Sequence, residues 1–213
     1  MQVIDKLPLT LHERLEMDEE IRIPATFDEF CEWATDLPYR VHYHAGEIIS
    51  LDMGIATKFH ELLVANLIGI FYSFFKNTDY FVYGSNRLVY IPELGDGFQP
   101  DVMIVKGEDE LMTYKKGKKT MEGVLNPFMV VEVLSKGTRD FDLAVKLHAY
   151  KKIGSLQHIL LLEQDTMFIS TYRRSTKPNE WINTDYELPI QTISIEDKEI
   201  SLSEIYAKLD LKK

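Results

Sequence analysis

Apolar residues recur at helical spacing in one long stretch of this chain, from about residue 55 to residue 76. The residues that repeat every three or four positions are Phe59, Leu63, Leu67, Ile70, Phe71 and Phe74. Such a stripe is typical of a helix that buries one face, and we expect it to be the longest helix of the protein. Shorter helices are predicted from Thr26 to before Pro38, from Thr138 to about Ile153 and from Ser203 to Leu209.

Most of the remaining chain has strand patterns. A hairpin is predicted over residues 39–51, and single strands over residues 80–91, 98–105, 128–134, 158–162, 167–173 and 181–185. Residues 95–97 are expected to form a turn and the lysine-rich residues 106–122 a loop. The segment 128–134 is apolar almost throughout, as a central strand is. This order predicts an α/β fold, a sandwich with a central mixed β-sheet flanked by helices.

The composition is that of a globular domain. Of 213 residues, 45% are hydrophobic and 27% charged, which excludes a disordered chain. Residues 1–25 are expected to form an N-terminal arm and residues 26–213 a single domain, because no repeat or linker divides them. No apolar run reaches the roughly 20 residues of a membrane span, and the first residues do not resemble a signal peptide. The single cysteine, Cys31, favours a cytoplasmic location.

The formal net charge of −10 argues against a protein that coats nucleic acid by bulk electrostatics. The basic residues are nevertheless gathered in two groups: Lys106, Lys115, Lys116, Lys118 and Lys119, and then Lys136, Arg139, Lys146, Lys151 and Lys152. Two interpretations stay open. The groups form a basic rim that holds phosphates around an acidic pocket, or they are ordinary solvated side chains.

Two carboxylates interrupt the apolar strands: Asp101 in FQPDVMIV and Glu132 in PFMVVEVLS. A buried carboxylate is costly unless a cation binds it, and two close carboxylates repel each other. A hard divalent cation relieves that repulsion, and Mg²⁺ or Mn²⁺ suits a site of oxygen ligands. Such an ion polarises a phosphodiester and orients water for in-line displacement. Lys146, on the following helix, is spaced to project back and stabilise the developing charge.

Each of these residues also has a structural interpretation. Asp101 is then a strand-end carboxylate bonded to backbone amides, and Glu132 is the partner of Arg139 or Lys146 in a salt bridge. Asp142 and Lys146 stand four residues apart, as in a helix-surface ion pair of small energy. Only the combination of the residues favours a catalytic site.

The order of these motifs resembles a known family. PD, a strand ending in EVLS, and the spaced Thr138, Asp142, Lys146 and Tyr150 are similar to the bacterial Uma-type restriction endonucleases of the PD-(D/E)XK nuclease superfamily. Further similar segments are Gly46-Glu47-Ile48, His60, QHILLLEQD with FISTYRR, and ISLSEIYAKL. The resemblance covers about residues 26–210. It implies a restriction-endonuclease-like sandwich and an Mg²⁺- or Mn²⁺-dependent endonuclease that hydrolyses phosphodiester bonds, with DNA as the expected substrate and a homodimer as the expected assembly.

The resemblance also implies roles for individual residues. Asp101, Glu132 and the backbone carbonyl of Val133 would be metal ligands. The wider superfamily has a lysine two residues after the glutamate, but this chain has Leu134 there. Lys146 is the expected replacement for that lysine. Glu47 is either an outer carboxylate, which binds a second metal or activates water, or an exposed hairpin acid.

The histidines leave more alternatives open. His60 orients water at the site, bonds Glu47, or is a satisfied histidine beside the core. His42 and His44 alternate in the hairpin, but without a third ligand they make a poor zinc site. Tyr150 is expected to pack its helix against the sheet. Two alternatives to the nuclease also stay open: a catalytically inactive nuclease-fold binding or assembly protein, and a hydrolase of smaller phosphate esters.

Overall fold

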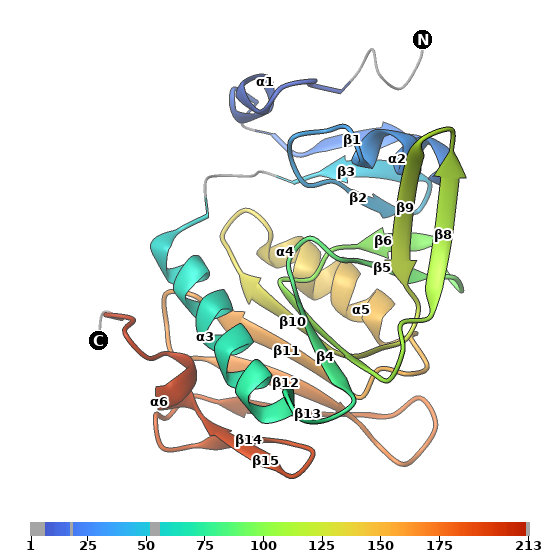
Figure 1. Ribbon diagram of the computed structural model, residues 1–213. Helices are drawn as coiled ribbons and strands as arrows, with labels where there is room; N and C mark the ends of the chain where they lie inside the picture. The colour runs from blue at the N-terminus through green and yellow to red at the C-terminus, as the bar shows by residue number, and fades with distance from the viewer. Residues whose placement is uncertain (1–6, 18, 52–55, 212–213) are drawn as a thin grey trace.

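A six-stranded mixed sheet forms the centre of the protein. The computed structural model describes residues 7–17, 19–51 and 56–211, and Figure 1 shows their arrangement. The strands of the central sheet are β4 (Tyr80–Gly84), β7 (Val102–Lys106), β10 (Pro127–Leu134), β11 (His158–Glu163), β12 (Ile169–Arg174) and β13 (Trp181–Tyr186). Their order is β13-β12-β11-β10-β7-β4, with β10 and β11 parallel and the other pairs antiparallel.

A second sheet contains the N-terminal strands and a long hairpin (Figure 1). Its strands are β1 (Ile21–Pro24), β2 (His42–His44), β3 (Glu47–Ser50), β5 (Leu88–Ile91), β6 (Asp96–Phe98), β8 (Leu111–Lys116) and β9 (Lys119–Val124). They are ordered β1-β3-β2-β6-β5-β9-β8. A separate hairpin of β14 (Thr192–Ile195) and β15 (Lys198–Ser201) follows near the C-terminus.

Helices lie on both faces of the central sheet. These are α3 (Lys58–Phe75), α4 (Arg139–Phe141), the π-helical turn η2 (Asp142–Lys146), α5 (Leu147–Tyr150) and α6 (Leu202–Ile205), whereas α1 (Leu11–Leu15) and α2 (Phe27–Ala34) lie at the second sheet (Figure 1). One hydrophobic core joins α3, α6 and the hairpin β14–β15 to one face of the sheet. Another core joins the continuous helical segment α4–η2–α5 to the opposite face and to the second sheet. The predicted α/β sandwich is therefore confirmed.

Strand β10 shows why the central sheet needs cover on both faces. All eight of its residues are buried, so both faces of the strand lie against other elements. Val131 and Val133 belong to the core on the α3 side, whereas Val130 and Leu134 belong to the core on the α4–α5 side. Because side chains alternate along a strand, Glu132 shares the second face and points toward the helical segment α4–η2–α5.

The predicted helices and the strands from β10 to β13 are confirmed within a few residues. The N-cap of α2 is Thr26, and the side chains and backbone of Thr26 and Glu29 form a capping box. Helix α3 is the longest in the described part of the chain, and Phe75 is its last residue. The predicted start of this helix near residue 55 lies partly outside the described residues. Among the described helices, none has the length and apolar character needed to cross a membrane.

Three expectations about strands were wrong. Residues 80–91 form two strands in different sheets, because the chain turns between Gly84 and Leu88. The turn near residue 95 lies over residues 92–95, and Asp96 and Gly97 belong to β6. The expected strand 98–105 is divided between β6 and β7.

The lysine-rich segment is a hairpin, β8–β9, and not a loop. Its apolar side chains Met112, Tyr114 and Met121 alternate with exposed residues and pack against a third core around α2. Gly117 takes the positive φ of 63° that the turn requires. The alternation was hidden because the buried face of the hairpin is only partly apolar.

The N-terminal arm is not irregular as expected. Thr10 and Glu13 form a capping box at α1, and β1 pairs antiparallel with β3, with Ile23 buried. The strand at β1 is short and has only one buried position, so its pattern was too weak to detect. The division of the chain into an arm and one domain stays a prediction.

The buried His158 in β11 should make the stability depend on pH. Burial, with the charge of Arg173, lowers its pKa to about 4, whereas an unfolded histidine titrates near about 6.5. As the pH falls, the unfolded chain therefore binds the proton first, and the free energy of unfolding decreases by roughly 3 kcal/mol between about pH 6.5 and pH 4. Urea denaturation at several pH values measures this slope. His158→Phe should flatten it and the exposed control His148→Gln should not; equal slopes in both variants would contradict this origin.

Candidate functional site

An acidic pocket lies where β7, β10, α3 and the helical segment α4–η2–α5 meet. Its volume is about 420 Å³. The side chains that define it are Arg40, His42, His60, Asp101, Glu132 and Lys146. They come from five separate stretches of the sequence, so this arrangement exists only in the folded protein.

Asp101 stands immediately before β7, beside β10. Its own N–H donates to the Val131 carbonyl at 3.1 Å, and its Oδ2 accepts the N–H of Val133 at 2.9 Å. The same oxygen lies 3.3 Å from Nε2 of His60, and Oδ1 lies 3.3 Å from Nη1 of Arg40. The backbone and two side chains therefore fix a carboxylate that is only 3% exposed.

The ionised form of Asp101 is strongly favoured. Burial alone would raise its pKa, but the hydrogen bond and charge of His60, with the charges of Arg40 and Lys146, lower the pKa to about 2. For His60, burial lowers the pKa, and the hydrogen bond and charge of Asp101 outweigh it and raise the pKa above its ordinary value. The two residues thus favour each other's charged forms.

Glu132 is held by the helix on the other side of the pocket. Its Oε1 accepts hydrogen bonds from Nζ of Lys146 at 3.1 Å and from the hydroxyl of Tyr150 at 2.6 Å. Lys146 Nζ also lies 2.8 Å from Oδ1 of Asp142. One buried lysine thus lies between two buried carboxylates, and a single positive charge cannot balance both.

The pKa values follow from this shortage of positive charge. Burial raises the pKa of Glu132 to about 8, although Lys146 opposes the rise. The pKa of Lys146 is also raised, because the charges of Asp142 and Glu132 outweigh the effect of its burial. Lys146 therefore stays charged, and Glu132 tends to keep its proton in this arrangement.

A π-helical turn brings Lys146 and Asp142 into the pocket. The N–H of Leu147 donates to the carbonyl of Asp142, five residues earlier, and this widens the helix at η2. Both Asp142 and Lys146 are 2% exposed. The expectation of a helix-surface ion pair was therefore wrong: the pair is buried, because the helix turns this side toward Glu132. Thr138 precedes the helix but makes no side-chain cap, since its hydroxyl bonds that of Ser135.

The structure brings together most of the predicted site residues. Asp101, Glu132, Val133, Lys146 and His60 all line the acidic pocket. Of the alternatives for His60, neither the bond to Glu47 nor the satisfied core histidine is found, because its Nε2 faces Asp101 and its buried Nδ1 has no hydrogen-bond partner among the described residues.

Glu47 lies elsewhere. It is the first residue of β3, is absent from the lining of the pocket, and faces Arg22 at 3.4 Å. This position agrees with the interpretation of Glu47 as an exposed acid of the hairpin. Glu47 lies outside the pocket because β3 belongs to the second sheet, where Glu47 pairs with His44 of β2 and not with a strand of the central sheet.

Two residues of the pocket, and one that contacts a pocket residue, escaped the sequence analysis as site residues. Arg40 contacts Asp101, His42 lines the pocket, and Tyr150 adds a hydrogen bond to Glu132 besides packing its helix. Arg40 and His42 are two residues apart at the start of β2, a spacing that puts both on one side of an extended chain. That spacing was a usable signal, but nothing in it indicated which side faces the site.

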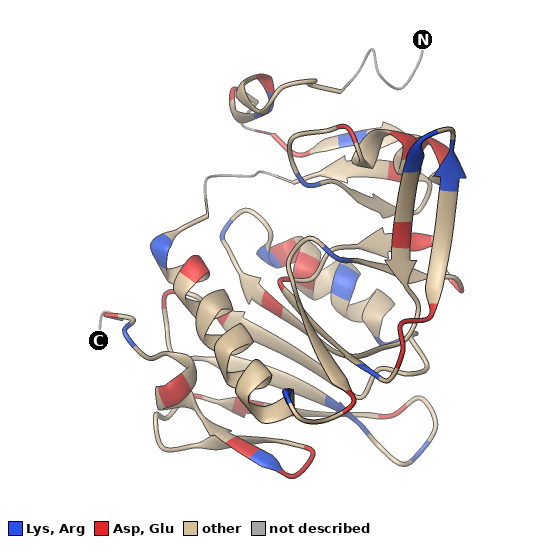
Figure 2. Cartoon of the chain, viewed as in Figure 1, with Lys and Arg blue, Asp and Glu red and all other residues tan. Residues whose placement is uncertain are grey.

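Most of the expected basic rim lies away from the pocket. Figure 2 shows basic residues gathered at the tip of the hairpin β8–β9, where Lys116 pairs with Glu32 and Lys119 with Asp36 of the α2 region. Arg139 pairs with Glu163. Of the two groups named above, only Lys136 and Lys146 line the pocket. The phosphate-binding interpretation therefore applies to these two residues together with Arg40.

The donor chemistry of the pocket fits a divalent cation. Within the described residues no three His, Cys, Asp or Glu side chains are grouped so that they alone could hold a metal ion, so water, a backbone carbonyl or the substrate would complete the ligand set. Both hydrogen bonds of Glu132 use Oε1, which leaves Oε2 available as a ligand. Two buried imidazole nitrogens, Nδ1 of His42 and of His60, also have no protein partner among the described residues.

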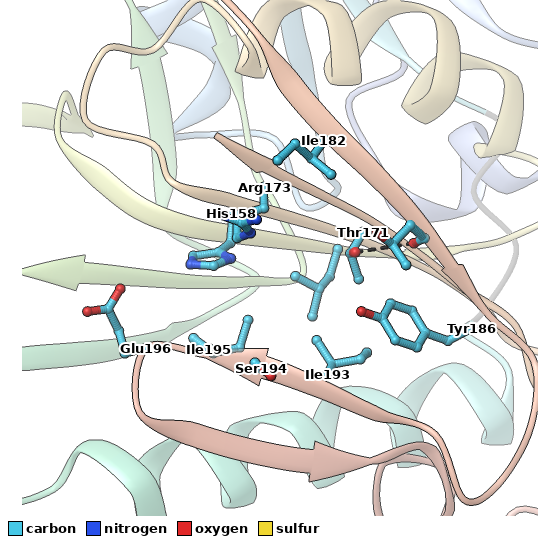
Figure 3. Close-up of a pocket in the computed structure, with 11 residues that line it drawn as sticks. His158, Thr171, Arg173, Ile182, Tyr186, Ile193, Ser194, Ile195 and Glu196 are labelled. Carbon is cyan, nitrogen blue, oxygen red and sulfur yellow. Dashed lines mark hydrogen bonds between the residues drawn. The ribbon is translucent and has the colours of Figure 1, made fainter. Parts of the chain in front are cut away.

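A second cavity, of about 540 Å³, lies between the central sheet and the hairpin β14–β15 (Figure 3). Its lining combines aliphatic side chains with His158, Thr171, Arg173 and Glu196. Glu196 is its single carboxylate, and Figure 3 shows it at the edge of the cavity. This cavity is larger than the acidic pocket but lacks paired carboxylates, so the chemistry points to the acidic pocket.

Comparison with known proteins shows the family of this chain. A family model, Uma2, described as “Putative restriction endonuclease”, matches residues 27–203. The chain therefore belongs to the Uma2 restriction endonuclease family. Two relatives come from Synechocystis sp. (strain ATCC 27184 / PCC 6803 / Kazusa). “Uncharacterized protein sll1609” is 28% identical over 140 residues, 66% of this chain and 75% of the relative, and “Uncharacterized protein slr1290” is 24% identical over 160 residues, 75% of this chain and 79% of the relative.

Removal of the buried cation should destabilise the protein. Lys146→Met leaves Glu132 and Asp142 without their shared positive charge, and we expect a loss of about 3–5 kcal/mol in the free energy of unfolding. The exposed Lys152 faces Glu93 at 3.7 Å, and Lys152→Met should cost less than about 0.5 kcal/mol. Urea denaturation of both variants measures the difference. Equal stabilities would mean that the buried triad contributes nothing.

Proposed function

We propose that this protein is a divalent-metal-dependent endonuclease that hydrolyses phosphodiester bonds in DNA. One observation carries the proposal: Asp101 and Glu132, from neighbouring strands, share a pocket with Lys146 from the following helix. Membership of the Uma2 family supports a nuclease at the level of the family. Metal dependence, DNA as substrate and a homodimeric assembly are predictions that go beyond that membership.

In this proposal the carboxylates of Asp101 and Glu132, with the carbonyl of Val133, hold Mg²⁺ or Mn²⁺. The bound ion supplies a polarised phosphodiester and an activated water. Lys146 takes the place of the superfamily lysine that Leu134 replaces, and its charge stabilises the negative charge that develops on the phosphate oxygens. Leu134 itself is 3% exposed within the apolar core, so no basic group acts from that position.

Arg40 has a separate role in the same proposal. Its guanidinium is about one quarter exposed and faces Asp101 at 3.3 Å. If Asp101 held a divalent cation, Arg40 would be available to bind the phosphodiester by paired hydrogen bonds. Lys136 lines the same pocket and adds a second positive charge for the backbone of the substrate.

One observation favours the inactive nuclease-fold alternative. Both carboxylates already contact protein groups, since Arg40 and His60 face Asp101 and Lys146 faces Glu132. In that alternative the chain binds nucleic acid or assembles with a partner but does not cleave. The two functions differ in metal binding and turnover, which the following experiments measure.

Substitution of either carboxylate should abolish cleavage. Asp101→Asn and Glu132→Gln keep the size of the side chain but remove its charge, and we expect at least about 100-fold slower nicking of plasmid DNA in Mg²⁺ or Mn²⁺, since each loses transition-state stabilisation of several kcal/mol. Glu93→Gln is the matched control, because Glu93 is an exposed carboxylate that faces Lys152. Circular dichroism checks the fold. Wild-type rates in both variants would reject this site, and absence of cleavage by the wild type on any DNA would favour the inactive alternative.

Metal affinity should rise with pH. Burial keeps the pKa of Glu132 near about 8 without metal, so below that pH a bound ion has to displace a proton. Affinity therefore increases as the pH rises through this range and levels off above it. Calorimetric titration with Mn²⁺ in buffers of different ionisation enthalpy measures the protons released. Glu132→Gln should remove the release; an unchanged release in that variant would assign the proton to another group.

A further inference from the structure

The cavity between the central sheet and the hairpin β14–β15 lies outside the acidic pocket. Its volume of about 540 Å³ falls within the roughly 300–1,000 Å³ of small-molecule sites. None of its lining residues also lines the acidic pocket. In the described part of the chain β14 and β15 pair only with each other, so no backbone ladder joins the hairpin to the sheet across the cavity. This cavity is therefore a candidate for a second, independent binding site.

Three neighbouring strands of the central sheet form one wall of the cavity. His158 of β11 lies in register with Arg173 of β12, which lies in register with Ile182 of β13. Paired residues of adjacent strands project from the same face of a sheet, so these three side chains form one row. The next row consists of Leu160, Thr171 and Thr184. Each row combines apolar and polar side chains, and the wall is amphipathic.

The hairpin forms the opposite wall, where two isoleucines provide an apolar surface (Figure 3). Ile193 and Ile195 are 2% and 1% exposed and belong to the core on the α3 side of the sheet. On the sheet side, Ile182 lines the cavity and is nevertheless 40% exposed. Covering an exposed aliphatic side chain with another apolar group is favourable. The walls therefore fit a ligand with an apolar body.

His158 is the most deeply buried polar side chain of this cavity. It is 6% exposed, and burial together with the charge of Arg173 lowers its pKa to about 4. Its ring makes no hydrogen bond to any residue that the structure describes. A neutral imidazole carries one N–H donor and one acceptor nitrogen. The cavity therefore contains a buried hydrogen-bonding group that the protein leaves unused.

Arg173 places a positive charge beside this imidazole. It is exposed at the cavity and has no salt bridge within the described residues. The next residue, Arg174, differs, because its guanidinium donates to the carbonyls of Ile153 and Leu156. An unpaired guanidinium can bind a carboxylate by two parallel hydrogen bonds. Arg173 and His158 together thus provide an anion-binding end of the cavity.

Hydrogen-bond donors outnumber carboxylates around the cavity. The hydroxyls of Tyr186 and Ser194 line it and bond no other described side chain, whereas the hydroxyl of Thr171 is used, since it donates to the carbonyl of Thr184 at 3.2 Å. Glu196 is the single carboxylate and lies at the edge (Figure 3). One cation is too few for the backbone of a nucleic acid. The donors and the apolar walls favour a small organic anion instead.

We propose that this cavity binds a small amphipathic carboxylate, an organic acid with an aliphatic or aromatic body. The carboxylate pairs with the guanidinium of Arg173 and accepts the N–H of His158. The apolar body lies between Leu160 on the sheet and Ile193 and Ile195 on the hairpin. This inference goes beyond the proposed nuclease function and does not depend on it, because the two sites share no lining residue.

Calorimetric titration of the full chain near neutral pH tests the site. The probes are octanoate, 3-phenylpropionate and L-phenylalanine, with phenylpropanol as the control that keeps the aromatic body and lacks the carboxylate. We expect a dissociation constant below about 1 mM for at least one carboxylate, and at least about tenfold weaker binding of the alcohol. Tighter binding of L-phenylalanine than of 3-phenylpropionate identifies an amino acid, and the reverse order identifies a simple organic acid.

Variants of the cavity assign the binding to these residues. Arg173→Gln changes an exposed side chain, so the fold is kept, and carboxylate binding should weaken at least about tenfold. Thr184→Trp places a large ring in the cavity from the exposed edge strand β13 and should abolish binding of acid and alcohol alike. Lys177→Gln is the matched control, because Lys177 is an exposed cation that faces Glu180 at 3.7 Å. Circular dichroism checks the fold of each variant.

Amide chemical shifts measured by NMR locate the bound probe, and we expect the changes in β11, β12, β13 and β14. Absence of binding by all three carboxylates, equal affinity for acid and alcohol, unchanged affinity in Arg173→Gln, or shift changes confined to other strands would each overturn the inference. Nicking of plasmid DNA is assayed separately, so a failure at this cavity leaves the nuclease proposal intact.

Discussion

The burial of Glu132 in the central strand is the constraint on which the site depends. All other positions of β10 are apolar, so the strand can sit in the middle of the sheet only if this one carboxyl group finds polar partners on the face where it points. The helical segment α4–η2–α5 supplies them through Lys146 and Tyr150. The same contacts that make burial tolerable also fix the helix against the sheet, so the core and the site are stabilised by one set of interactions.

Asp101 is held by a different set of contacts. Its partners are the backbone of β10, the imidazole of His60 in α3 and the guanidinium of Arg40 just before β2. One carboxylate is thus kept ionised while the other tends to stay protonated, although both are almost fully buried. The difference comes from the number of positive groups around each, and it gives neighbouring acids distinct chemical behaviour.

The sequence allowed the α/β sandwich, the long helix and the meeting of Asp101 and Glu132 at one pocket to be predicted, because each depends on a strong local pattern or on one buried polar residue in an apolar strand. It did not allow the position of Glu47 or the pocket role of Arg40 and His42 to be predicted. Those depend on how the second sheet packs against the first, and a hairpin has no local signal for which of its residues face another sheet. The buried state of Asp142 was hidden for a similar reason, since an i,i+4 pair looks the same on either side of a helix.

The π-helical turn η2 has a consequence for length changes in this region. A π turn contains one residue more than an α-helical turn would need, and its loss would rotate everything after it by about 100° around the helix axis. Tyr150, which follows η2, would then leave Glu132 while Asp142, at the start of the turn, would stay in place. Single-residue deletions and insertions between β10 and α5 are therefore far more disruptive than most substitutions there, and the spacing of Asp142, Lys146 and Tyr150 is itself a structural element of the pocket.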